Sequence, residues 1–193
     1  MPRKKREWAK DCIYHIITRG NRHQDLFKCD ADFEIFLDLL SKAHCRYGFA
    51  AMGYCLMTNH VHLLLRMGDK ELSEAMKEVL SLYAMNFNTR YRYDGHLFQG
   101  RFSCSMVETD AYLLAASRYI HMNPVKARMV YDPGLYEYSS YNAYIGKNPC
   151  PDFLETKTIL SMFPDGADGY KEFVTSSGNG KLDRQVEMDS KGV

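Results

Sequence analysis

The sequence has almost no net charge, no long apolar run and no closely spaced cysteine pair. Its 193 residues hold 25 Lys and Arg against 24 Asp and Glu, which gives a net charge of +1. No apolar stretch reaches the roughly 18 uncharged residues of a membrane-spanning helix. The first residues, Met1 to Trp8, lack the apolar core of a secretory signal peptide. We therefore expect a protein that has no membrane partner and is located in the cytoplasm.

The six cysteines are dispersed, and no C-x-x-C pair occurs. This spacing argues against a zinc ribbon and favours free thiols in a reducing compartment. With 46% hydrophobic and 25% charged residues, the composition is that of an ordinary globular protein. The length fits one domain of roughly 100–200 residues with a short extension.

The near-zero net charge conceals a difference between two parts of the chain. Residues 1–130 hold 19 basic and 14 acidic residues, a net charge of +5, whereas residues 131–193 hold 6 and 10, a net charge of −4. A basic main part with interspersed aromatic residues is compatible with a polyanionic partner such as nucleic acid.

Hydrophobic periodicity predicts strands at 12–18, 49–57, 61–67 and 101–107, and helices at 32–45, 71–88 and 110–123. The order β-α-β-β-α-β followed by a helix is that of an α+β, ferredoxin-like (RRM-like) fold. We expect an antiparallel sheet with helices on one face, plus an extra C-terminal helix.

The end of the chain is expected to be less regular. Pro124 is predicted to end or kink the third helix. Residues 150–174 have room for one short helix, and the chain from Ser176 onward, rich in Gly, Ser and charge, is predicted to be disordered. This divides the chain into a main domain, 1–145, and a C-terminal extension, 146–193.

The strongest local feature is His60-Val61-His62 at the start of a predicted strand. Alternation along a strand places both imidazoles on one face. Two histidines in this arrangement can chelate one divalent ion, although such a triplet also arises by chance.

A second feature lies on the third predicted helix. Tyr119 and Asn123 are one helical turn apart and share a face. A tyrosine and an amide near two histidines suit metal-assisted attack on a phosphodiester, with the phenolate as nucleophile. Taken singly, a packed tyrosine and a helix-ending asparagine are the more common interpretations, but they are weaker for the two residues together with the histidine pair.

Three segments together resemble one family. Tyr54-Cys-Leu-Met-Thr-Asn-His60-Val-His62, Gly95-His-Leu-Phe-Gln-Gly-Arg101-Phe and Arg118-Tyr-Ile-His-Met-Asn-Pro-Val125 are similar to motifs of the single-tyrosine HUH transposases. The resemblance covers residues 8–145 and is strongest to the branch associated with repetitive extragenic palindromes (REPs).

The resemblance implies a mechanism. His60 and His62 match the residues that bind Mg²⁺ or Mn²⁺, and Asn123 matches a third, polar position where many relatives have glutamine. Tyr119 matches the nucleophile, which attacks single-stranded or hairpin DNA and leaves a 5′-phosphotyrosine and a free 3′-OH. Some relatives are homodimers that share their active sites, so a homodimer is a possible assembly.

Arginine, histidine and glutamine side chains are candidates for contacting DNA. The predicted set is Arg19, Arg22, His23, Arg90, Arg92, His96, Gln99 and Arg101, with Tyr91, Tyr93 and Phe98 as candidates for stacking on unpaired bases.

Other interpretations of these residues remain open. Tyr112 lies on roughly the same helix face as Tyr119, and His121 is rotated by about 200° from it and is interpreted as structural. His15 is interpreted as a packed side chain, although it could approach the site across the sheet. A non-catalytic single-strand-binding domain is the alternative function. A hydrolase using water is less favoured, because Asp69 is a poor candidate for its general base.

Overall fold

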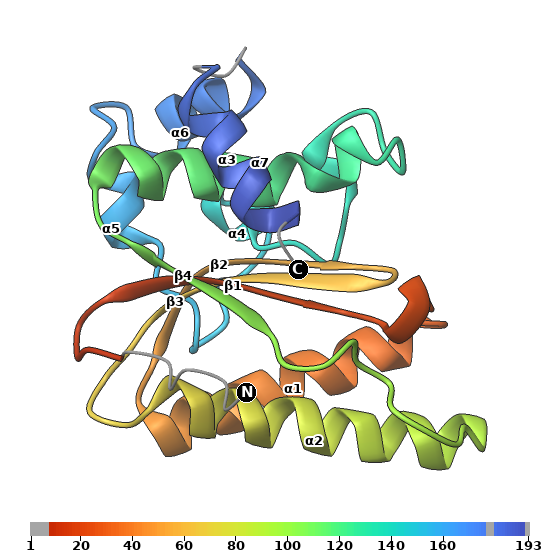
Figure 1. Cartoon of the computed structure of the whole chain (residues 1–193). Helices are drawn as coiled ribbons and strands as arrows, with labels where there is room; N and C mark the ends of the chain where they lie inside the picture. The colour runs from red at the N-terminus through yellow and green to blue at the C-terminus, as the bar shows by residue number, and fades with distance from the viewer. Residues whose placement is uncertain (1–7, 177–179, 192–193) are drawn as a thin grey trace.

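A four-stranded antiparallel sheet forms the centre of the fold (Figure 1). The computed structural model describes residues 8–176 and 180–191. The strands are β1 (Ile13–Arg19), β2 (Ala50–Met57), β3 (His60–Arg66) and β4 (Ser103–Val107). They lie in the order β2-β3-β1-β4, with every neighbouring pair antiparallel. The predicted ferredoxin-like α+β fold is confirmed.

Two long helices, α1 (Asp30–Tyr47) and α2 (Leu72–Tyr91), cover one face of the sheet (Figure 1). Helix α1 begins where Asp32 accepts hydrogen bonds from the backbone N–H groups of Lys28 and Cys29. It ends at Gly48, whose φ of 69° is a left-handed conformation that glycine adopts without strain. The buried faces of α1 and α2 form an apolar core with Val61, Leu63 and Leu65 of β3.

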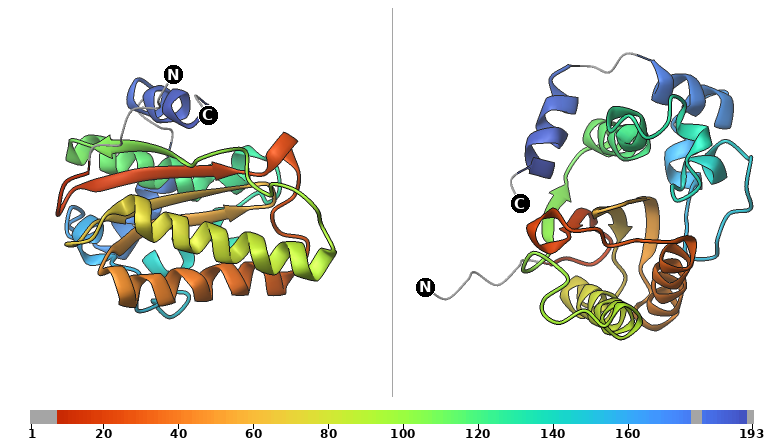
Figure 2. Two further views of the ribbon diagram at one scale, coloured as in Figure 1. Left: turned by 60° about the horizontal axis from the view of Figure 1, so that its bottom comes forward. Right: turned by 90° about the vertical axis from the view of Figure 1, so that its right-hand side faces the viewer.

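The remaining helices lie on the opposite face, with α3 directly above the sheet (Figures 1 and 2). They are α3 (Asp110–Lys126), α4 (Tyr141–Tyr144), α5 (Lys157–Leu160), α6 (Ala167–Thr175) and α7 (Leu182–Lys191), and short 3₁₀ turns occur at Asn21–His23 and Pro133–Leu135. A second apolar core lies between this layer of helices and the sheet. The candidate site described below lies between α3 and the sheet.

Pro124 does not end α3, which continues to Lys126. A proline within a helix lacks the N–H for one main-chain hydrogen bond, but its neighbours can still form theirs. Ala127 N–H donates to the carbonyl of Asn123, and Met129 N–H donates to that of Pro124. Both Asn123 and Pro124 are buried, so packing keeps this turn helical although proline disfavours the interior of a helix.

The prediction of a disordered tail was wrong for residues 182–191, which form α7 and pack on α3. The tail is polar, but its acidic groups have partners: Asp183 accepts two hydrogen bonds of 2.8 Å from Arg118, and Asp189 accepts one of 2.6 Å from Tyr112. Residues 177–179 and 192–193 of the predicted tail lie outside the described residues. Residues 150–174 hold α5 and most of α6 rather than one short helix.

The proposed division of the chain at residue 145 stays a prediction. Ile159 and Tyr170, from the extension, belong to the same buried core as Leu64 and Tyr119 of the main part. The six cysteines form no disulfide, as expected; Cys55 is buried and three others are exposed. No helix within residues 8–176 and 180–191 is long and apolar enough to span a membrane.

Candidate active site

The two histidines of β3 face α3, as strand alternation predicts. Val61 between them belongs to the core beneath α1 and α2, so the adjacent imidazoles point to the other side. His62 is 1% exposed, whereas His60 at the end of the strand is half-buried. Their ring centroids are 5.0 Å apart, with the rings nearly perpendicular at 82°.

Helix α3 brings Tyr119 to this pair. Thr109 caps the helix, because its side-chain oxygen accepts a hydrogen bond of 3.1 Å from Tyr112 N–H. The Tyr119 ring centroid lies 5.6 Å from that of His62, and the residue is 8% exposed. Asn123 is also buried, and its Nδ2 atom has no partner among the described residues.

His15 of β1 belongs to the site, contrary to its interpretation as an ordinary packed residue. Its Nε2 atom lies 3.3 Å from Nδ1 of His62, and the two rings are stacked. Its ring centroid is 6.4 Å from that of Tyr119. In the β1–β3 register, Ile17 is opposite His62, so His15 is the diagonal neighbour of His62 across the strands. The sequence gives no sign of this pairing beyond strand alternation.

Asn59 sets the orientation of His60. The Nδ1 atom of His60 lies 2.7 Å from Oδ1 of Asn59. The Nδ2 group of Asn59 donates to the carbonyl of His23, so the amide oxygen faces the imidazole as an acceptor. His60 therefore donates from Nδ1, and its Nε2 atom has a free lone pair.

Burial keeps the imidazoles neutral. The pKa of His60 is lowered to about 4, mainly by burial and to a smaller extent by the neighbouring Arg19 and His23. Burial also holds the pKa of His62 well below its usual value, and the neighbouring His60 and His15 act in the same direction. Neutral imidazole is the form that binds a metal, so no proton competes for these nitrogens near pH 7.

These residues fit a divalent metal. The Nε2 atoms of His60 and His62 form no hydrogen bond with any described residue, and the buried amide of Asn123 lies one turn from Tyr119. No group of three or more His, Cys, Asp or Glu able to hold a metal occurs in the described part of the chain. A site of two imidazoles and an amide leaves coordination positions for phosphate oxygens, as catalysis requires.

Lys126 is a site residue that the sequence analysis missed. Its ammonium lies over the Tyr119 ring, 4.4 Å from the centroid. The seven-residue spacing on one helix face was the available signal. A cation above the face of an aromatic ring is attracted by its π electrons, so this contact fixes Lys126 beside Tyr119.

Tyr112 and His121, the other two candidate side chains on α3, form hydrogen bonds within the protein. Tyr112 donates its hydroxyl hydrogen to Asp189. His121 is fully buried, with Nε2 2.7 Å from Ser140 Oγ and Nδ1 2.7 Å from the Tyr170 hydroxyl. The interpretation of His121 as structural agrees with these contacts.

The predicted DNA-contacting residues divide into two places. The 95–101 segment runs beside the end of β1, where Gln99 N–H donates to Arg19 and Asn21 N–H donates to Leu97. Arg19 is the strand partner of His60, so these residues share the sheet end that carries the histidines. This end gathers Arg19, Arg22, His23, His96, Gln99 and Arg101; Arg90 and Arg92 lie instead at the end of α2.

Two of the predicted arginines already have protein partners. Arg19 donates to the carbonyl of Ser190 on α7, at 2.7 Å, and Arg90 is paired with Asp32 at 3.1 Å. The aromatic candidates are also engaged: Tyr91 donates to Asp32, and Tyr93 and Phe98 pack against the core beneath the sheet. These three rings therefore support the loop, and their role in stacking on bases stays a prediction.

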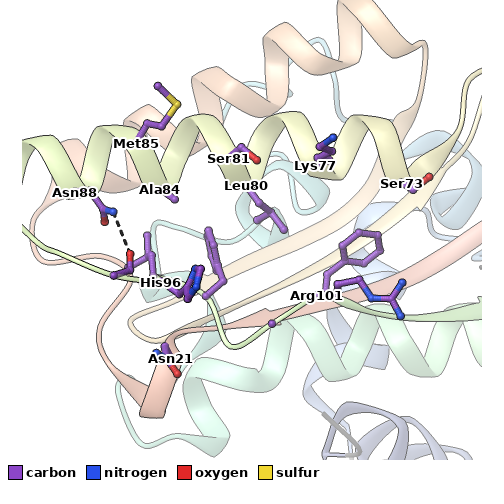
Figure 3. Close-up of a pocket in the computed structure, with 15 residues that line it drawn as sticks. Asn21, Ser73, Lys77, Leu80, Ser81, Ala84, Met85, Asn88, His96 and Arg101 are labelled. Carbon is purple, nitrogen blue, oxygen red and sulfur yellow. Dashed lines mark hydrogen bonds between the residues drawn. The ribbon is translucent and has the colours of Figure 1, made fainter. Parts of the chain in front are cut away.

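A groove of about 870 Å³ runs between α2 and the 95–102 segment (Figure 3). Lys77, His96 and Arg101 supply its basic side chains, and Leu80 and Ala84 line it from α2. The groove extends from the sheet end that carries the basic residues to α2. Two of the predicted DNA-contacting residues, His96 and Arg101, therefore line a concave surface.

The fold is similar to that of a solved structure, and the sequence matches one known family. The structure of a REP-associated tyrosine transposase bound to a REP hairpin matches with a TM-score of 0.66 and 16% identity, covering 80% of this chain and 92% of that one. The structure of a tRNA(His) guanylyltransferase from Saccharomyces cerevisiae matches with a TM-score of 0.47 and 7% identity, over 100% of this chain and 82% of that one. No curated protein matches. The family described as "Transposase IS200 like" matches residues 9–123, and the chain belongs to this family of transposases.

Proposed function

We propose that this transposase nicks and rejoins single-stranded or hairpin DNA through a 5′-phosphotyrosine formed on Tyr119, with Mg²⁺ or Mn²⁺ as cofactor. The observation that carries the proposal is the position of Tyr119, with its ring 5.6 Å from His62. The nucleophile and both histidines come from the same chain. A homodimer that exchanges tyrosines is therefore not required by this arrangement.

The chemistry is a balanced exchange of phosphoester bonds. The Tyr119 oxygen forms a bond to phosphorus as the bond from phosphorus to the 3′ oxygen breaks. The phenol proton passes to solvent, and the departing oxygen takes up a proton to become a 3′-OH. The tyrosyl ester conserves the bond energy, so a second 3′-OH can reverse the reaction and join new ends.

Each residue of the site has a defined task. His60, His62 and Asn123 would hold the divalent ion, which when bound draws charge from the scissile phosphate. Lys126, 4.4 Å from the Tyr119 ring centroid, stabilises the phenolate as it attacks. Burial of His62 and most of Tyr119 limits the access of water to the scissile phosphate, which favours attack by tyrosine over hydrolysis.

The basic end of the sheet supports a single strand as substrate. Arg22, His96 and Arg101 are exposed near His60 and can contact phosphates on both sides of the cleavage point. The related structure holds a REP hairpin, which supports a hairpin as the binding element here.

A domain that binds single strands without chemistry is less well supported. RRM-like domains stack bases on an open sheet face. Here the central residues of β1, β2 and β3 are buried on both sides, under α1 and α2 on one face and α3 on the other. The sheet therefore offers no open platform for stacking at these strands.

The test compares labelled single-stranded, hairpin and fully paired DNA of one sequence, at one salt concentration with Mn²⁺. We expect a covalent protein–DNA adduct on denaturing gels with the single-stranded and hairpin forms, and none with the duplex, because a stacked duplex cannot bend a phosphate into the buried site. Adduct yield should fall steeply with salt, since arginine–phosphate contacts release counterions. Equal rates on duplex and single strand would contradict the proposal.

A further inference from the structure

His15 is the least expected residue of the site. It lies in the middle of β1 and is 1% exposed, whereas its neighbours Tyr14 and Ile16 point into the core on the other face. A buried imidazole carries two polar nitrogens, and leaving either without a partner is costly. The role of His15 therefore depends on its one polar contact.

That contact is with His62. Nε2 of His15 lies 3.3 Å from Nδ1 of His62, the ring centroids are 5.5 Å apart and the planes differ by 23°. Nδ1 of His15 has no partner among the described residues. With both rings neutral, a single hydrogen lies between Nε2 and Nδ1, and it can belong to either ring.

Only one of the two arrangements permits metal binding. If His15 donates, the hydrogen of His62 must sit on Nε2, which then has no lone pair for a metal. If His62 donates from Nδ1, its Nε2 is free, and His15 carries its own hydrogen on Nδ1. The second arrangement gives His62 the same tautomer that Asn59 imposes on His60.

We propose that His15 is a positioning residue that accepts the Nδ1 hydrogen of His62 and thereby presents His62 Nε2 to the divalent ion. This inference rests on the proposed function for the identity of the metal site. His15 does not ligate the ion, because its Nε2 accepts from His62 and its Nδ1 carries a hydrogen and therefore has no lone pair. Stacking of the two rings fixes the direction of the His62 ring as well. Such hydrogen-bond partners of ligating histidines set both tautomer and orientation.

The first test measures the tautomer directly in the metal-free protein. Long-range ¹H–¹⁵N NMR spectra at pH 7 distinguish a hydrogen on Nδ1 from one on Nε2. We expect His62 to carry its hydrogen on Nδ1. A hydrogen on Nε2 of His62 would overturn the inference, and this measurement requires no substitution and no DNA.

The second test uses variants. His15→Leu removes the acceptor, whereas His15→Gln retains an acceptor oxygen near the position of Nε2. We expect His15→Leu to weaken Mn²⁺ affinity about 10- to 100-fold by calorimetry. His15→Gln should recover most of this loss. His121→Gln is the matched control and should bind Mn²⁺ like the wild type, because His121 is fully buried and its ring nitrogens contact Ser140 and Tyr170 rather than His60 or His62.

The outcomes separate this inference from the proposed function. A folded His15→Leu variant with unchanged Mn²⁺ affinity would overturn the role of His15, even if the wild type cleaves DNA. Tight Mn²⁺ binding that depends on His15, in a protein that forms no DNA adduct, would instead support the inference and contradict the proposed mechanism. If His15→Leu does not fold, the wild-type tautomer and the affinity of His15→Gln decide the question.

Discussion

Two groups of histidines lie on the same side of the sheet: His121 alone, which is fully buried, and His15, His60 and His62, of which His60 is half-buried. The groups differ in how many of their ring nitrogens have hydrogen-bond partners. Both nitrogens of His121 have hydroxyl partners, Ser140 and Tyr170, at 2.7 Å. In the other group, Nδ1 of His15 has no partner, and the Nε2 atoms of His60 and His62 bond no described residue. Burial alone therefore does not distinguish the two groups; the presence or absence of hydrogen-bond partners for the ring nitrogens does.

The physical reason is the cost of burying a polar group without a partner. His121 joins α3 to α4 and α6, and its hydrogen bonds offset the cost of its burial. The other group leaves Nδ1 of His15 buried without a partner among the described residues, close to Tyr119, and this lowers stability. We therefore expect substitutions of His60 or His62 to lower activity more than stability, and substitution of His121 to lower stability more than activity.

The largest effect is expected for the nucleophile. Tyr119→Phe should abolish the covalent DNA adduct, because it removes the oxygen that would attack the phosphorus, while the ring and its packing remain. Thermal unfolding and DNA binding should stay near the wild type. Tyr112→Phe is the matched control on the same helix and should retain the adduct. An adduct formed by Tyr119→Phe would transfer the role to another tyrosine, with Tyr112 first.

The next effect concerns the two histidines of β3. His60→Ala and His62→Ala should each lower the cleavage rate by at least about a hundredfold with any divalent ion, since each removes one metal donor. Unfolding free energy should fall by no more than roughly 0.5–3 kcal/mol. EDTA should abolish cleavage by the wild type, and cleavage that survives EDTA would contradict a metal mechanism regardless of the variants.

The opposite pattern is expected for His121. His121→Leu removes one hydrogen-bond partner from each of the buried Ser140 and Tyr170 hydroxyls, although Ser140 keeps its hydrogen bonds with Tyr54. The change should lower the unfolding free energy by about 1–3 kcal/mol. Denaturant unfolding at pH 7.5 measures this change. Cleavage per folded molecule should be unchanged, since His121 does not contact the site. If His121→Leu lost most of its cleavage activity while its unfolding free energy stayed at the wild-type value, the distinction between the two groups would be wrong.

The smallest expected effect is a decrease in the unfolding free energy at acidic pH. Burial lowers the pKa of His121 to about 3, whereas in the unfolded chain it is near 6.5. Below pH 6.5 the unfolded chain takes up a proton that the folded protein does not, so stability is lost as pH falls from 6.5 toward 3. Between pH 6.5 and 5.5 this amounts to about 1 kcal/mol. The stability difference between wild type and His121→Leu should narrow by that amount, and a constant difference would show that His121 does not titrate this way.

The sequence by itself determined the sheet and the main members of the site. Strand alternation placed His60 and His62 on one face, and helical spacing placed Tyr119 and Asn123 together. These are local periodicities, which depend only on backbone geometry. The positions of the strands and of the first three helices were predicted for the same reason, with end points that differ by a few residues.

Only the tertiary structure decided what depends on contacts between distant segments. His15 meets His62 through the register of β1 against β3, and that register is set by packing rather than by local pattern. Residues 182–191 are polar enough to predict disorder, yet they form α7 because Arg118 and Tyr112 of α3 bind its carboxylates. Pro124 remains inside α3 because buried neighbours compensate for one missing hydrogen bond. In each case a long-range contact outweighs a local preference of a few kcal/mol.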